Sequence, residues 1–352
     1  MTLTRTPWGT APDGTTVERV ELASDTIRLA VLTWGATVQS LVAPDRDGAP
    51  SDVVLGFDAL EGYTGQNPFF GATVGRFGNR IAGARFELDG VAHDLPANDG
   101  PNTLHSGPHG FHTRVWELVD AQETPDGGYA ELRLVSPDGD QGFPGALDVR
   151  TRYTVAGGVV ALRTTAVTGA PTVVNLTNHA YFNLHGPDRG IGDHLVEVPA
   201  DAFVAVDDTA IPLPGAPADV SGTPFDLRDA VAIGDRLALR HEQLEAVGGI
   251  DHTFVLGAPG GDGPHTAAVV VDPCSGRRLT VRTTQPGVQV YTGNHLDGTL
   301  LGKGGVPAAH RTGLCLETQH FPDSPHRPDY PTTVLRPGEV YSTLTEWHLD
   351  TV

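Results

Sequence analysis

The chain has 352 residues and carries 43 Asp and Glu against 23 Lys and Arg, which gives a formal net charge of −20 at pH 7. This charge disfavours binding to nucleic acid or to an anionic membrane surface, since both need clustered Lys and Arg. The 44 glycines and 28 prolines divide the chain into short segments and argue against a helical bundle.

Short runs of alternating apolar and polar residues, ended by turn residues, follow one another along the chain. Alternation with a period of two is typical of strands with one buried face, and tight turns between neighbouring runs predict hairpins. The pattern predicts an all-β fold, a sandwich or a barrel, which we interpret as one domain over residues 1–352. The clearest runs are residues 27–31, 86–88, 130–134, 147–153, 160–164, 269–271 and 279–281.

Helical signals are weak by comparison. The best candidate covers residues 229–247, where Gly234 interrupts the pattern, and a short helical turn is expected around Leu60 to Tyr63. The glycine-rich stretch 256–265 predicts a surface loop rather than a domain boundary.

Several features favour a cytoplasmic protein. Cys274 and Cys315 are too few for a disulfide framework, so we expect both thiols to be reduced. The sequence has no run of 18 uncharged apolar residues, and its first residues lack the apolar core of a signal peptide.

Polar side chains gather in a few segments, close to where strands are expected to end. They combine His, Asp, Glu, Arg, Asn and Gln with aromatic residues, which suits a neutral polyhydroxylated ligand such as a sugar. Glu317 lies between Leu316 and Thr318 in an apolar run, and a desolvated carboxylate there would be a better base. Bonding to loop backbone is the alternative role for any single residue. The segments are 74–83, 98–112, 175–186, 248–254, 283–298 and 314–331.

Other catalytic patterns are weak. The spacing of His105, His109 and His112 could suggest a metal site, but no HExxH motif or paired cysteines support it. The chain has no G-x-S-x-G elbow and no glycine-rich phosphate loop. We therefore expect neither a metal nor a cofactor.

In these polar segments the chain resembles the aldose 1-epimerase (galactose mutarotase) family. The resemblance spans roughly residues 5–350 and implies a large antiparallel β-sandwich, the galactose mutarotase-like supersandwich. It also implies that the chain interconverts the α and β anomers of free hexoses such as galactose and glucose, by general acid/base ring opening and closure. The motifs, in the order of the family, are PDRDG (44–48), DVVLGFD (52–58), GRFGNRI (75–81), TLHSGPHGF (103–111), NLTNHAYFNL (175–184), DHTF (251–254), QPGVQVYTGN (285–294), LCLETQ (314–319) and LRPGE (335–339).

The same resemblance assigns roles to residues of this chain. His179 is similar to the general acid of the family and Glu317 to the general base, and His105 corresponds to a second histidine near the ring oxygen. At neutral pH we expect Glu317 to be ionised and His179 to be protonated beside carboxylates. The expected sugar contacts are Asn79, Arg80, Tyr181, Asp251 and Gln289.

Two positions depart from the family pattern. Ser106 stands where the family commonly has Gly, and Ala180 where it commonly has Ser. Neither change removes an acid or a base. Because Ser106 follows His105 directly, we expect it to reshape the wall of the sugar pocket.

Three other functions stay open from the sequence. A hexose-6-phosphate 1-epimerase would need a basic cluster, for which Arg76, Arg80 and Arg311 are the candidates. A non-catalytic sugar-binding protein on the same fold and a metal-dependent β-barrel enzyme are the others. The expected partner is a small-molecule monosaccharide, with no nucleic acid, membrane or obligate protein partner.

Overall fold

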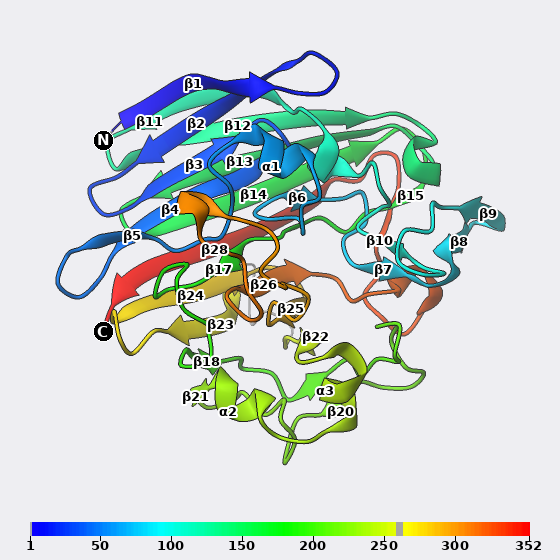
Figure 1. Cartoon of the computed structure of the whole chain (residues 1–352). Coiled ribbons are helices and arrows are strands. Elements are labelled where there is room, and N and C mark those ends of the chain that lie inside the picture. The colour runs from blue at the N-terminus through cyan, green and yellow to red at the C-terminus, as the bar shows by residue number, and fades with distance from the viewer. Residues whose placement is uncertain (1, 258–262) are drawn as a thin grey trace.

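The computed structural model describes residues 2–257 and 263–352, and regular structure there is mostly β-strand (Figure 1). The predicted all-β class is therefore confirmed. The strands and helices are β1 (Thr2–Thr10), β2 (Thr16–Ala23), β3 (Arg28–Leu32), β4 (Thr37–Pro44), β5 (Pro50–Asp52), α1 (Leu60–Thr64), β6 (Thr73–Val74), β7 (Arg80–Ile81), β8 (Arg85–Leu88), β9 (Val91–Asp94), β10 (Thr103–Leu104), β11 (Glu117–Thr124), β12 (Gly127–Ser136), β13 (Leu147–Ala156), β14 (Val159–Thr168), β15 (Thr172–Val173), β16 (Thr177–Asn178), β17 (Tyr181–Phe182), β18 (Leu195–Glu197), β19 (Ala202–Phe203), β20 (Ala218–Asp219), β21 (Val231–Ala232), α2 (Ile233–Leu237), α3 (Glu242–Val247), β22 (Asp251–Val255), β23 (His265–Val271), β24 (Arg277–Thr283), β25 (Gly287–Tyr291), β26 (Leu314–Gln319), β27 (Val334–Leu335) and β28 (Tyr341–Thr351).

Three antiparallel sheets make up most of the molecule. Among the described strands, the largest sheet has the order β11-β12-β13-β14-β28-β24-β23-β18-β21, and a second has the order β17-β26-β25-β22-β19-β20. The third sheet contains β1 to β5 in sequence order, and β2 contacts β12 of the largest sheet (Figure 1). The C-terminal strand β28 lies between β14 and β24 and so joins two parts of the chain within one sheet.

The predicted hairpins are confirmed. The runs at 147–153 and 160–164 belong to β13 and β14, which pair from Leu147 opposite Thr168 to Ala156 opposite Val159. The run at 86–88 belongs to β8, which pairs with β9 across the turn at Asp89 and Gly90.

The helical predictions are confirmed in part. Helix α1 forms at the expected turn, but residues 229–247 do not make one helix. They form β21, then α2, and then α3 after a break at residues 238–241. The predicted loop at 256–265 lies between β22 and β23, and its residues 258–262 lie outside the described residues. None of the described helices is long and apolar enough to cross a membrane.

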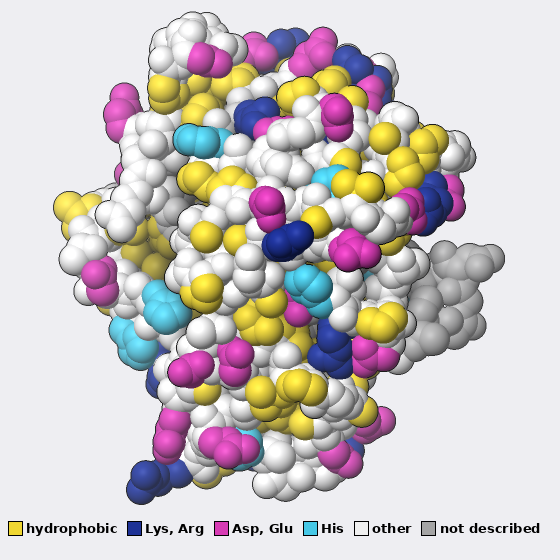
Figure 2. Space-filling model, turned by 90° about the vertical axis from the view of Figure 1, so that its right-hand side faces the viewer, with side chains coloured by type: hydrophobic (Ala, Val, Ile, Leu, Met, Phe, Trp, Pro, Cys, Tyr) yellow, Lys and Arg dark blue, Asp and Glu magenta, His cyan; other side chains and the backbone are white. Residues whose placement is uncertain are grey.

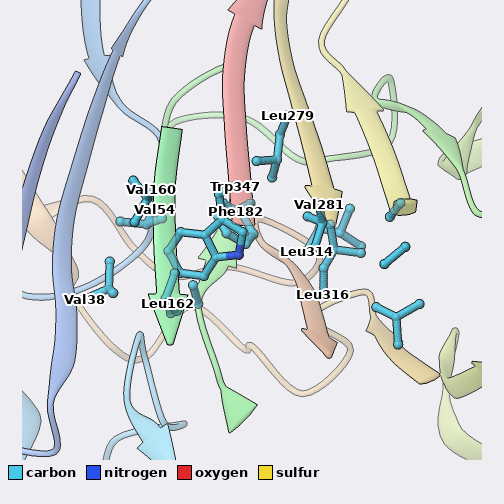
Figure 3. Close-up of a cluster of buried hydrophobic side chains, with 14 of the residues drawn as sticks. Val38, Val54, Val160, Leu162, Phe182, Leu279, Val281, Leu314, Leu316 and Trp347 are labelled. Carbon is cyan, nitrogen blue, oxygen red and sulfur yellow. The ribbon is translucent and has the colours of Figure 1, made fainter. Parts of the chain in front are cut away.

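The core between the two larger sheets fixes the position of β26. Leu314 and Leu316 on β26 pack among Leu279, Val281 and other apolar side chains of the core cluster (Figure 3). Trp347 of β28 meets Phe182 of β17 edge to face, with ring centroids 5.1 Å apart. Since side chains alternate along a strand, Cys315 and Glu317 point away from this core.

A buried arginine ties the loop after β12 to the segment that precedes β7. Arg76 is 1% exposed, and its guanidinium donates to the carbonyls of Pro144, Gly145 and Pro137 at 2.6–2.8 Å and to Oγ of Ser136 at 2.9 Å. Burial lowers the pKa of Arg76 to about 10, so it still carries its charge at neutral pH.

We predict that Arg76→Lys destabilises the fold by about 2–4 kcal/mol, because one ammonium group cannot reach all the acceptors that the planar guanidinium fork satisfies. Urea unfolding followed by circular dichroism measures the change. Arg336→Lys is the matched control, since this arginine is exposed and pairs with Asp89 at the surface. Equal, small effects of both substitutions would contradict the prediction.

Candidate active site

The polar segments converge on a cavity of about 180 Å³. It lies against β17, β22, β25 and β26, and residues 68–69 and 104–105 also line it. Its lining residues are Pro68, Phe69, Asn79, Arg80, Leu104, His105, His179, Tyr181, Asp251, Tyr291, His295 and Glu317. Seven of the eight residues expected at the site are therefore brought together, and the eighth, Gln289, lies behind them.

Glu317 projects from the middle of β26, between β17 and β25. The residue is 3% exposed, and its Oε2 has no hydrogen-bond partner among the described residues. Burial, and then the nearby charge of Asp251, raise the pKa of Glu317 well above its usual range. The side chain is thus a desolvated carboxyl group that is free to bond to a ligand in the cavity.

His179 faces Glu317 across a short gap. Its Nε2 lies 3.7 Å from Oε1 of Glu317, and its ring is stacked between Tyr181 and Phe69, with centroids 5.0 and 5.7 Å away. Burial lowers the pKa of His179 to about 3. Burial favours the uncharged form of each group, which is the opposite direction to the expected ionised Glu317 beside a protonated His179.

The uncharged pair and the ion pair nevertheless hold the same number of protons. A carboxylic acid beside a neutral imidazole becomes a carboxylate beside an imidazolium when one proton moves. A ligand that donates to the carboxylate and accepts from the imidazolium favours the charged arrangement. The pair can therefore give one proton and take one in a single exchange.

His105 has a fixed tautomer. The backbone N–H of Asn79 donates to its Nδ1 at 3.0 Å, so the proton of the neutral ring lies on Nε2. Burial, followed by the charge of His179, holds the pKa of His105 well below its usual range. His105 is thus a neutral N–H donor at the cavity.

The Nε2–H tautomer of His105 disfavours metal binding at the site. His105, His179 and Glu317 offer ligand atoms that lie within 4.8 Å of one another. A metal on Nε2 of His105 would need the ring proton on Nδ1, where the N–H of Asn79 already points. The donor set therefore does not suit a metal.

Arg80 and Asp251 bring charged groups to the cavity. Arg80 donates to Asp99 at 2.7 Å and lies 3.9 Å from Asp251. Gln289 donates through its amide to Oδ1 of Asp251 at 2.6 Å, from a strand position directly opposite Glu317. Gln289 thus orients Asp251, and Asp251 and Arg80 both line the cavity.

Some lining residues carried no clear signal in the sequence. Phe69 packs on His179 and also on His105, at 4.6 Å between ring centroids, from a loop whose position the local sequence does not reveal. Tyr291 and His295 belong to the polar segment at 283–298, but nothing in it singles them out. The hydroxyl of Tyr291 accepts the backbone N–H of His295 at 2.9 Å.

The two departures from the family pattern face away from the cavity. The backbone N–H of Phe77 donates to Oγ of Ser106 at 2.7 Å, and Ala180 is buried in the core cluster. The expectation that Ser106 reshapes the pocket wall is therefore wrong. Ser106 has a φ of +65°, in the left-handed region where glycine is favoured.

The basic residues do not form a phosphate site. The guanidinium of Arg76 donates hydrogen bonds to backbone carbonyls, and Arg311 donates to the carbonyl of Gly248. Arg80 is paired with Asp99. On the face in Figure 2, which carries β7 and β10, basic side chains are interspersed with acidic, histidine and hydrophobic ones.

A larger cleft of about 1260 Å³ lies beside the cavity. It is lined by residues that include Glu18, Trp34, His112 and Arg114, and His112 touches Phe69 with ring centroids 4.7 Å apart. Glu317, His179 and His105 line only the smaller cavity among the cavities described here, so the smaller cavity is the candidate active site.

The fold is an antiparallel β-sandwich in which a buried carboxyl group and a buried imidazole, 3.7 Å apart, line one small cavity. The family model "Aldose 1-epimerase" matches residues 18–348. A galactose mutarotase of Bos taurus is 46% identical over 98% of each chain, and an aldose 1-epimerase of Escherichia coli K12 is 38% identical over 96% of each. The crystal structure of a galactose 1-epimerase from Lactobacillus acidophilus superposes with a TM-score of 0.86 at 28% identity and covers 100% of this chain and 99% of its own.

The chain belongs to the aldose 1-epimerase family, and it is an isomerase.

We predict that acid destabilises the fold because buried histidines stay uncharged in it. Burial lowers the pKa of His179 and His252 to about 3, of His112, His194 and His320 to about 4, and of His105 well below its usual range. The unfolded chain binds these protons near pH 6.5, so stability present above that pH is lost as the pH falls. The five histidines with a pKa of about 3 or 4 in the fold should by themselves take up about four protons on unfolding at pH 5.5.

The free energy of urea unfolding between pH 7.5 and 5.5 measures this uptake. The effect should persist at high salt, since it arises from burial rather than from the net charge of the surface. A free energy that is constant over this range would contradict the prediction.

Proposed function

We propose that the chain interconverts the α and β anomers of free hexoses, with Glu317 as general base and His179 as general acid. The observation that carries the proposal is the separation of 3.7 Å between the buried carboxyl of Glu317 and Nε2 of His179 on one wall of a cavity large enough for one sugar ring. Anomer exchange needs a proton removed from the C1 hydroxyl and one added to the ring oxygen. Glu317 and His179 together can remove the first proton and supply the second.

The reaction follows from this exchange. Glu317, as a carboxylate, takes the proton of the C1 hydroxyl, while protonated His179 gives its Nε2 proton to the ring oxygen, and the bond from C1 to the ring oxygen breaks. The open aldehyde rotates about C1–C2. Glu317 then returns its proton to the carbonyl oxygen, His179 takes the proton back, and the ring closes from the other face.

The intermediate state corresponds to the uncharged pair. After ring opening, Glu317 is a carboxylic acid and His179 is neutral, which is the arrangement that burial favours. The same desolvation that raises the pKa of Glu317 makes its carboxylate a stronger base toward the C1 hydroxyl. Burial therefore lowers the barrier to proton removal and stabilises the open-chain stage.

The other lining residues bind and orient the sugar in this proposal. His105 donates its Nε2 proton to an oxygen at the reacting end, where negative charge develops. Asp251, Arg80 and Asn79 bond to hydroxyl groups, and Tyr181 supplies aromatic surface for an apolar face of the ring. Gln289 acts through Asp251 rather than on the sugar.

We further propose that residues 1–352 act as one domain in the cytoplasm. The site draws side chains from residue 68 to residue 317, so no segment shorter than residues 68–317 contains it. Both cysteines are free thiols. The partner in this proposal is a free monosaccharide, without nucleic acid, a membrane or an obligate protein partner.

We predict that Glu317→Gln and His179→Asn each reduce kcat by about 10²–10⁴-fold, since each removes one proton-transfer group. Optical rotation of freshly dissolved α-D-galactose and α-D-glucose follows the reaction. Exposed Glu87→Gln and His310→Asn are the matched controls and should leave the rate unchanged. Full activity of either site variant, with circular dichroism showing a folded protein, would contradict the assignment.

We predict that Asp251→Asn raises KM for galactose about tenfold and changes kcat less, because an amide accepts weaker hydrogen bonds than a carboxylate. Asp94→Asn is the control, since this side chain is 84% exposed on β9. A collapse of kcat with an unchanged KM would show that Asp251 acts in the chemical step instead.

A further inference from the structure

Cys315 is a buried titratable group that the proposed reaction does not use. It lies two residues before Glu317 on β26 and on the same face of the strand, with 0% exposure. Its Sγ lies 3.5 Å from Nδ1 of His179. The imidazole ring thus lies along β26, with one nitrogen beside the thiol and the other beside the carboxyl of Glu317.

The thiol is uncharged in this environment. Burial, and then the nearby charges of Glu317 and Asp251, hold the pKa of Cys315 well above its usual range. A neutral thiol can accept a hydrogen bond through sulfur or donate one through S–H, both weakly. The pairing with His179 therefore does not hold a second charge at the site.

The proposed proton exchange sets a condition on His179. After His179 gives its Nε2 proton to the ring oxygen, Nε2 must stay bare until it takes the proton back. The remaining ring proton must then lie on Nδ1, and it needs an acceptor there, because a buried N–H without a partner is costly. Sulfur of Cys315 is in position to accept it.

We propose that Cys315 is a positioning residue for His179, and that its sulfur accepts a hydrogen bond from Nδ1–H so that Nε2 is the nitrogen that exchanges the proton. This inference rests on the proposed function, and it adds a residue that touches no sugar atom. It makes His179 the counterpart of His105. In His105, a backbone N–H fixes the proton on Nε2, and that ring can only donate.

A weak acceptor such as sulfur suits a residue that only positions the proton of His179. A carboxylate at Nδ1 would stabilise the imidazolium and weaken His179 as an acid. A thiol fixes the tautomer with little effect on the charge. His179 therefore remains an acid strong enough to protonate a sugar ring oxygen.

The test compares Cys315→Ala, which removes the acceptor, with Cys315→Ser, which keeps one. Cys274→Ala is the matched control, because this cysteine is exposed on another part of the chain. Nitrogen NMR of histidine-labelled protein, without sugar, reports which nitrogen of each ring carries the proton. The signals of His179 are identified by their loss in His179→Asn.

We expect His179 of the wild type to be protonated on Nδ1, and Cys315→Ala to shift the proton toward Nε2. The kcat of Cys315→Ala should fall about tenfold with KM within twofold of the wild type. Cys315→Ser should keep the wild-type tautomer and most of the activity, and Cys274→Ala should change neither.

Two results would overturn the inference. One is a wild-type His179 that carries its proton on Nε2, and the other is a Cys315→Ala protein with unchanged tautomer and kcat. If the wild type did not accelerate mutarotation at all, the proposed function would fail, and the nitrogen spectra would still decide the role of Cys315.

Discussion

The buried carboxyl group of Glu317 is the constraint around which the site is arranged. It stands on β26, between β17 and β25, and its Oε2 has no hydrogen-bond partner within residues 2–257 and 263–352, at a cost that a fold selected for stability alone would avoid. The strand that carries it cannot shift, because Leu314 and Leu316 are packed into the core on its other face. The packed core therefore holds β26 in place and keeps the carboxyl group of Glu317 at the wall of the active-site cavity.

Two kinds of group surround Glu317. Some contact the histidine nitrogens and set which nitrogen carries the ring proton, and others hold the side chain of Asp251 in place. Cys315 and the backbone of Asn79 contact the Nδ1 atoms of the two histidines, so each ring presents Nε2 to the cavity. Gln289 and Arg80 hold Asp251 near the same space. His179 and Glu317 can then exchange a proton without a change in their total charge.

The alternation pattern predicted local hairpins but not the pairing of strands that are far apart in the sequence. Alternation of apolar residues was sufficient for β13 and β14, because a hairpin is local and its register follows from its turn. It could not place β28 between β14 and β24, since that pairing joins residues far apart along the chain. Residues 229–247 were the best helical candidate, with an interruption expected at Gly234. The structure places Gly234 inside α2 instead, and the break between the two short helices falls at residues 238–241.

Site residues could be predicted from the sequence mainly where they belong to a motif of the family. His179 and Glu317 stand in motifs of the family, whereas Phe69 is brought to the cavity by tertiary packing alone. The effect of burial on the pKa values of the pair was not foreseen, because the sequence does not show how deeply each group is buried. Ser106 was expected at the pocket wall, but its hydroxyl bonds to the backbone of Phe77 instead.

The central claim is that Glu317 and His179 share one proton that the sugar redistributes. Infrared difference spectra between the wild type and Glu317→Gln, recorded at about pH 6 with and without galactose, test it most directly. The account predicts a carboxylic acid band of Glu317 in the free protein at this pH, well above the ordinary pKa of glutamate, and a weaker band when the cyclic sugar binds. A Glu317 that is fully ionised in the free protein, with no change on sugar binding, would contradict it.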